Sequence, residues 1–183
     1  MKNKLSIQDH NRNLFLNSIH EALWGFGMAF HSTYAIIPLF LNELNAPTYI
    51  IGSIAGIFVV GSAIPQIITA FLGRNIKNLK LSVIASHGLL LPPIFIAGFV
   101  FIYADLHEQS AWIFYFICFV FFTLGLGVAF PMWADFLDTA HVSKKRGQFF
   151  GVSFLFNCLA GLVGGFAVKS LFSSSVEFPV NFG

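Results

Sequence analysis

The chain has 183 residues, of which 56% are hydrophobic and only 10% carry a charge. Ordinary soluble domains are about 45–50% apolar and about 25% charged, so this composition excludes a typical soluble fold and indicates a membrane protein. A formal net charge of +2 is too small to favour a nucleic-acid-binding protein. The two cysteines lie in apolar stretches, which excludes a disulfide framework and a cysteine metal site.

Five stretches are apolar and long enough to cross a membrane as helices, which takes about 20 residues. In chain order they cover residues 13–41, 49–72, 81–103, 111–133 and 149–172. The first is long enough to tilt, and the third contains Pro92-Pro93 in its middle, where we expect a kink. The sequence therefore predicts an all-α, polytopic membrane helix bundle.

Positive charge alternates between the connections of these predicted helices. Three connections hold it, namely the N-terminal tail with Lys2, Lys4 and Arg12, the second loop with Arg74, Lys77 and Lys80, and the fourth loop with Lys144, Lys145 and Arg146. The loops "NELNAPT" and "ADLHEQS" contain no Lys or Arg. Because positively charged loops stay in the cytoplasm, the sequence predicts a multi-pass protein of the plasma membrane with a cytoplasmic N-terminus and an external C-terminus.

Small residues recur at helical spacing on two of the predicted helices. The set on the second helix is Gly52, Gly56 and Ala63, and the set on the fifth is Asn157, Gly161 and Gly165. Small residues let helix backbones approach closely in lipid, so we expect both stripes to be packing surfaces.

The first predicted helix carries polar side chains on one broad arc. The members of this arc that we predict to line a cavity or bind substrate are Asn17, His20, Glu21, Trp24, His31 and Tyr34. Apolar residues such as Phe15, Ile19, Phe26 and Phe30 occupy the opposite arc. An acid within a membrane span is costly, so Glu21 is either a substrate or proton site or a structural residue partly solvated near the helix end.

The other members of the arc also have two readings. His20 and His31 are three turns apart, too far to share one metal ion, so each either functions in a cavity or serves as a hydrogen-bonded structural residue. Trp24 and Tyr34 either stack on a ligand or pack against neighbours.

The segment "HEALW" lacks the second histidine of the zinc-protease pattern H-E-x-x-H. We therefore predict no metal, no cofactor and no enzymatic activity.

Two connections carry a resemblance to a known family. "PQIITAFLGRNIKNLK" lies where members of the major facilitator superfamily have the signature G-x-x-x-D-R-x-G-R-R, with Arg74 matching its Arg and Lys77 lying in its basic tail. "PMWADFLDTAHVSKKRGQFFG" is similar to the family's connection between helices 4 and 5, in which an acid precedes a basic-Arg-Gly sequence. With the predicted topology, the chain resembles the N-terminal half of such a transporter over nearly its whole length.

The chain also departs from the family's motifs. Gly73 stands where the signature has Asp, and Thr69 stands where it has Gly. Phe121 replaces an Arg that many proton-coupled exporters carry, and "AGLVGG" lacks the proline of the antiporter motif. These motifs therefore do not support antiport.

The resemblance implies secondary active transport of a small solute by alternating access, with or without a coupling ion. It also implies cytoplasmic gating loops, for which the candidates are Arg74, Lys77, Asp135, Asp138, Arg146 and Gly147. The alternative for these charged residues is that they only set the topology.

Family members have two six-helix halves, so we expect residues 1–183 to be a partial N-terminal half that ends before a sixth helix. Its expected partners are membrane lipid, the solute and a C-terminal half, and no nucleic acid. The alternative functions are a non-transporting membrane assembly or receptor subunit and, less favoured by the residues, a membrane-embedded enzyme.

Overall fold

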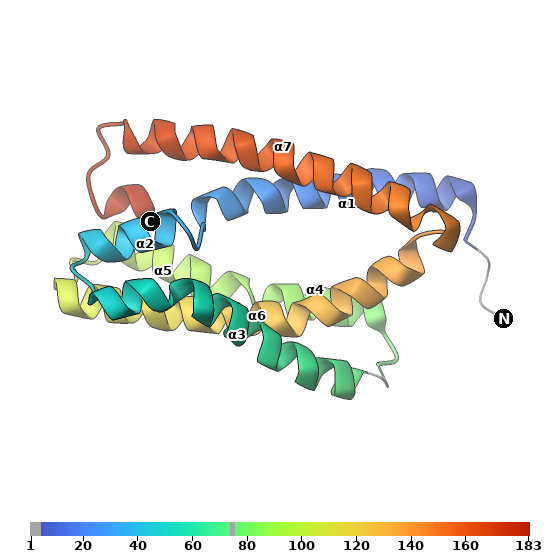
Figure 1. The fold of residues 1–183 in the computed structure, drawn as a ribbon, viewed down its shortest axis with the longest axis horizontal. Coiled ribbons are helices and arrows are strands. Elements are labelled where there is room, and N and C mark those ends of the chain that lie inside the picture. The colour runs from blue at the N-terminus through green and yellow to red at the C-terminus, as the bar shows by residue number, and fades with distance from the viewer. Residues whose placement is uncertain (1–4, 74–75) are drawn as a thin grey trace. The chain divides into compact units, whose positions relative to one another are not determined.

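The computed structural model of this chain describes residues 5–73 and 76–183, and every regular element among them is helical (Figure 1). This confirms the predicted all-α fold. The α-helices are α1 (Ile7–Phe30), α2 (Ile36–Glu43), α3 (Thr48–Leu72), α4 (Leu79–Gly88), α5 (Leu91–Tyr103), α6 (Glu108–Ala140) and α7 (Arg146–Phe172). Two 3₁₀ turns, η2 (Ser143–Lys145) and η3 (Val180–Phe182), accompany them.

The chain divides into two compact units. Unit 1 comprises the residues up to Ser32 together with Phe136–Ser174, so it contains α1, the last turns of α6, and α7. Unit 2 comprises Thr33–Asp135 together with Ser175–Gly183, so it contains α2 to α5 and most of α6.

Four helical stretches among the described residues are long and apolar enough to cross a membrane, which makes this a multi-pass membrane protein. They are Thr48–Leu72, Leu79–Tyr103, Glu108–Ala140 and Ser143–Phe172. α1 is not among the four, although it has 24 residues. Its polar and charged side chains, which include Asp9, Arg12 and Glu21, make it the least apolar of the long helices.

The predicted first helix, residues 13–41, is not continuous. α1 ends at Phe30 and α2 begins at Ile36, with the segment 31–35 between them outside the helices. Pro38 explains the break, because in a continuous helix it would clash with the carbonyl of Tyr34 and supply no N–H to that carbonyl. Starting a new helix at Ile36 places Pro38 in the first turn, where no N–H is needed.

The third predicted helix is interrupted close to where the sequence predicted a kink. α4 ends at Gly88 and α5 begins at Leu91, so Pro92 and Pro93 fall in the first turn of α5. The fixed φ angle of proline and its missing N–H both suit this position. Together the two helices form one candidate span.

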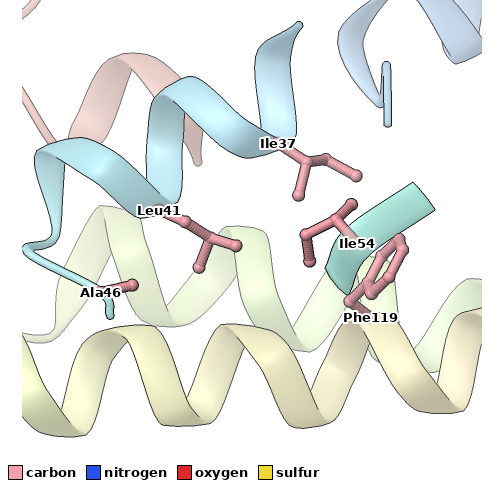
Figure 2. Packing of buried hydrophobic residues seen from close by; sticks show 5 residues of the cluster. All are labelled: Ile37, Leu41, Ala46, Ile54 and Phe119. Carbon is pink, nitrogen blue, oxygen red and sulfur yellow. The ribbon is translucent and has the colours of Figure 1, made fainter. Parts of the chain in front are cut away.

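An apolar cluster holds the centre of unit 2 (Figure 2). Ile37 and Leu41 of α2 and Ala46 lie with Ile54 of α3 and Phe119 of α6, and all five are less than one-tenth exposed. A second cluster contains the buried ring of Phe40, which lies edge-on to both Phe101 and Tyr115 at centroid distances of 4.8 Å. Edge-to-face ring pairs of this kind favour one defined arrangement of the three helices.

The turn after α2 is fixed by a helix cap. Asn45 has a φ of 54°, a left-handed conformation that asparagine tolerates better than most residues. The Ala46 N–H donates to the carbonyl of Leu41 at 2.9 Å, and the Asn45 N–H donates to that of Asn42 at 3.0 Å. This pair of bonds is a Schellman motif, and the contact of Ala46 with Leu41 completes it.

α3 and α6 approach each other closely, but not through the residues that the sequence predicted. A Cβ on Gly61 would lie 2.6 Å from the hydroxyl oxygen of Thr123, and one on Gly127 would overlap the carbonyl of Ser62. Gly52 and Gly56, by contrast, have open space where a Cβ would lie. The predicted packing stripe on α3 is therefore wrong at these two glycines, and the contact lies more than one turn further along the helix.

Candidate functional site

In unit 1, α1 and α7 run side by side over much of their length (Figure 1). Glycine makes the approach possible, because a Cβ on Gly25 would overlap the backbone of Asn157 and one on Gly164 would lie 2.7 Å from the carbonyl oxygen of Phe26. Gly161 faces Gly25 in the same contact. Gly165 has open space around it, so the stripe predicted on this helix holds for Asn157 and Gly161 but is shifted by one residue at its end.

Glu21 lies within this contact between the two helices. The side-chain amide of Asn157 donates to the Glu21 carboxylate at 3.3 Å and to the Glu21 backbone carbonyl at 3.1 Å. The Glu21 side chain is 22% exposed, and His20 Nδ1 lies 3.8 Å from its carboxylate. The Asn157 amide thus binds both the side chain and the backbone of Glu21, which lies on the predicted polar arc of α1.

The remaining members of that arc have different surroundings. Asn17 is buried, and its amide donates to His141 Nε2 at 2.8 Å. Trp24 is half-buried, and His31 is the residue that caps the C-terminal end of α1. Tyr34 lies beyond that end, in unit 2, and is exposed. The predicted arc therefore runs along α1 only as far as His31, and whether it lines a cavity stays a prediction.

The opposite arc of α1 is exposed in the described part of the chain, as expected for a face that contacts lipid. Phe15 is 66% exposed, and Ile19, Phe26 and Phe30 are also exposed. α1 thus places Asn17 and Glu21 of its polar side in contacts within unit 1, while the rings on its apolar side are uncovered.

Among the described residues, two of the predicted gating residues contact each other. The guanidinium of Arg146, at the start of α7, pairs with the carboxylate of Asp138 on the last turns of α6 and donates to the Asp138 carbonyl at 3.3 Å. Gly147, Lys77 and Asp135 are exposed. Arg74 lies outside the described residues. A change in the Arg146–Asp138 pair between transport states is not tested by this arrangement and stays a prediction.

Three residues that the sequence did not single out as functional complete the polar contacts of unit 1. His10 and His141 contact each other, with 3.2 Å between their Nδ1 atoms, and Asn157 binds Glu21. The two histidines are separated by 131 residues, so no spacing pattern could have paired them. Asn157 did stand in the predicted packing stripe, where a polar residue among glycines was the available signal.

The comparison with protein families agrees with this architecture. A family model of the Major Facilitator Superfamily matches residues 5–165. No curated protein and no solved structure matches the chain. The match spans the five predicted helices almost completely, including both connections that carry the sequence resemblance. This chain therefore belongs to the Major Facilitator Superfamily, whose members are membrane transporters.

Proposed function

We propose that this chain takes part in the secondary active transport of a small solute by alternating access. In this proposal α1 lines the solute path, and Glu21 binds either the solute or a coupling ion. The connection between α6 and α7 lies in the cytoplasm, at the plasma membrane, and forms part of the gate. The observation that carries the proposal is the polar contact between Glu21 and Asn157 where α1 packs on α7, in a chain of a transporter family.

The surroundings of Glu21 favour a functional role over a purely structural one. Carboxylates within membrane spans are rare and mark substrate or ion pathways by default. Among the described residues, the Glu21 carboxylate has an amide donor and a nearby imidazole. It forms no ion pair with Lys or Arg that would balance its negative charge. A carboxylate held in place but not neutralised can exchange a proton or bind a cationic group of a solute.

The Arg146–Asp138 pair supports the proposed gate. It joins the last turns of α6 to the first residue of α7 across the short connection that contains η2. Both side chains remain accessible to water, at 39% and 59% exposure. An exposed pair contributes only about 0–1 kcal/mol, so it can break and re-form during a transport cycle without a large barrier.

The proposal is tested by solute counterflow in proteoliposomes. Vesicles containing the protein together with its expected C-terminal half are loaded with amino acids, sugars, nucleosides or organic anions, and uptake of the labelled solute is followed. We expect saturable counterflow of one solute class, lost in Glu21→Gln. Glu43→Gln is the matched control, since Glu43 is an exposed acid at the end of α2. Absence of saturable flux across the panel, or equal flux in both variants, would contradict the proposal.

A further inference from the structure

Two buried histidines join the first turns of α1 to the connection between α6 and α7. His10 and His141 are 0% and 3% exposed, and their rings meet edge to face at a centroid distance of 5.1 Å. The ring of His141 is also stacked on Phe149 of α7 at 4.0 Å. We call His10, Asn17, His141 and Val142 the histidine junction.

The hydrogen bonds of the histidine junction have only one consistent direction. The backbone N–H of Val142 donates to His10 Nδ1 at 3.3 Å, so that nitrogen carries no proton. His141 Nδ1 lies 3.2 Å from the same nitrogen and must therefore be the donor of that bond. His141 Nε2 is then unprotonated and accepts from the Asn17 amide at 2.8 Å. Both imidazoles are thus neutral in this arrangement.

Adding a proton to either histidine breaks a bond of the junction. A proton on His10 Nδ1 would point at the N–H groups of Val142 and His141, which are both donors. A proton on His141 Nε2 would point at the N–H of Asn17. His10 Nε2 is also buried without a hydrogen-bond partner among the described residues, so the charge of a protonated ring would find no acceptor there.

The charges around the junction act against protonation. Burial, and after it the positive charge of Lys145, lower the pKa of His10 below its ordinary value. Burial, and after it His10, lower the pKa of His141 to about 4. The acids closest in sequence to the two histidines are engaged elsewhere, because Asp9 pairs with Arg12 and Asp138 pairs with Arg146. The remaining cation of this connection, Lys144, is exposed.

We propose that the histidine junction is a proton-binding site that holds the start of α1 against the α6–α7 connection when empty and releases it when occupied. A histidine with a lowered pKa stabilises the closed arrangement fully only above its ordinary pKa, about 6.5. The contribution is lost as the pH falls from about 6.5 towards about 4, the value for His141. Sequence predicts this end of the unit to be cytoplasmic, so the signal would be acidification of the cytoplasm. The inference does not depend on which solute is transported.

The test is a distance measurement by pulsed electron spin resonance on the whole chain in lipid nanodiscs. Spin labels are placed at Gln8→Cys and Gln148→Cys, two exposed positions on α1 and α7, with Cys118 and Cys158 replaced by serine. We expect one narrow distance distribution at pH 8, which broadens and lengthens below about pH 6. A distribution that is the same from pH 8 to pH 4 would overturn the proposal without any histidine variant.

Two variants assign the response to the junction. The double variant His10→Gln and His141→Gln removes both titrating groups of the histidine junction, so the distribution should no longer change with pH. Lys145→Gln removes the nearby positive charge and should move the transition to higher pH. His107→Gln is the control, because His107 is an exposed histidine in unit 2 and its loss should leave the transition in place. A pH response that survives in the double variant would contradict the proposal.

Discussion

Each of the two units is stabilised internally by a different kind of contact. In unit 1 the helices α1 and α7 meet through glycines and through the polar pair Glu21–Asn157, and Asn17 of α1 also binds His141 of the α6–α7 connection. In unit 2 the centre is made of aliphatic and aromatic side chains around Ile54 and Phe119. Lipid tails are as apolar as leucine, so burial in unit 2 stabilises mainly through close packing rather than through removal from water.

Because of this difference, we expect the two units to be sensitive to different changes. Apolar packing tolerates changes of polarity poorly but does not depend on pH or on any single donor. The polar pairs of unit 1 each depend on one hydrogen-bond donor and acceptor, so they can be changed singly by a proton or a bound solute. We therefore expect unit 2 to provide stability and unit 1 to provide the response to ligands.

The largest effect is expected from truncating a ring in the apolar centre of unit 2. Phe119→Ala should lower the free energy of unfolding by about 3 kcal/mol, because the cavity cannot collapse between packed helices. Phe119 is 1% exposed, whereas Phe121 on the same helix is 63% exposed. Phe121→Ala is therefore the matched control and should change the free energy of unfolding by less than about 0.5 kcal/mol. SDS titration of the purified protein measures both, and equal losses would contradict the packing described here.

A smaller effect is expected where α1 and α7 touch through backbone. Gly164→Leu should lower the free energy of unfolding by about 2 kcal/mol, because the added side chain would push α7 away from Phe26 and Ala29 of α1. Gly165→Leu, one residue further along, enters open space and should be nearly neutral. The same titration compares them, and a greater loss in Gly165→Leu would mean that the facing side of α7 has been assigned wrongly.

The smallest of the three effects is expected at the polar contact itself. Asn157→Leu removes the donor to Glu21 and should cost about 1 kcal/mol, a usual value for one hydrogen bond between membrane helices. Cys158 is the exposed neighbour of Asn157, and Cys158→Leu is the control because it leaves the hydrogen bond from Asn157 to Glu21 in place. If Asn157→Leu were as costly as Phe119→Ala, the contact would be a main source of stability and the proposed division of roles would fail.

Hydropathy was sufficient to predict the helical class, because a lipid environment imposes long apolar segments. The family was predicted from the expected topology together with the resemblance of two connections to family motifs. The break between α1 and α2 was missed although Pro38 signals it, since the apolar run continues on both sides of the proline. The shift from Gly165 to Gly164 shows a different limit. One residue turns a helix face by about 100°, and a stripe of small residues does not fix which edge is in contact.

The sequence predicted the α1 side of the candidate site but not the residues that α1 contacts. The polar arc of α1 is visible as a pattern within one helix, and Glu21 stands out because it is an acid in an apolar span. Its partner Asn157 and the partner of Asn17, His141, lie on other elements more than 120 residues away. Such pairs follow from how the helices pack, and a single sequence contains no direct record of that packing.

We expect the polar arc of α1 to border a water-filled path and its opposite arc to face lipid. The most direct measurement is labelling of single cysteines by a water-soluble maleimide in membrane vesicles, since the reagent reacts only with thiols that water reaches. We expect His20→Cys and Trp24→Cys to react with the maleimide. Ile19→Cys and Phe26→Cys lie on the exposed apolar arc and should be protected. Equal labelling of both pairs, or labelling of the apolar pair alone, would contradict this expectation.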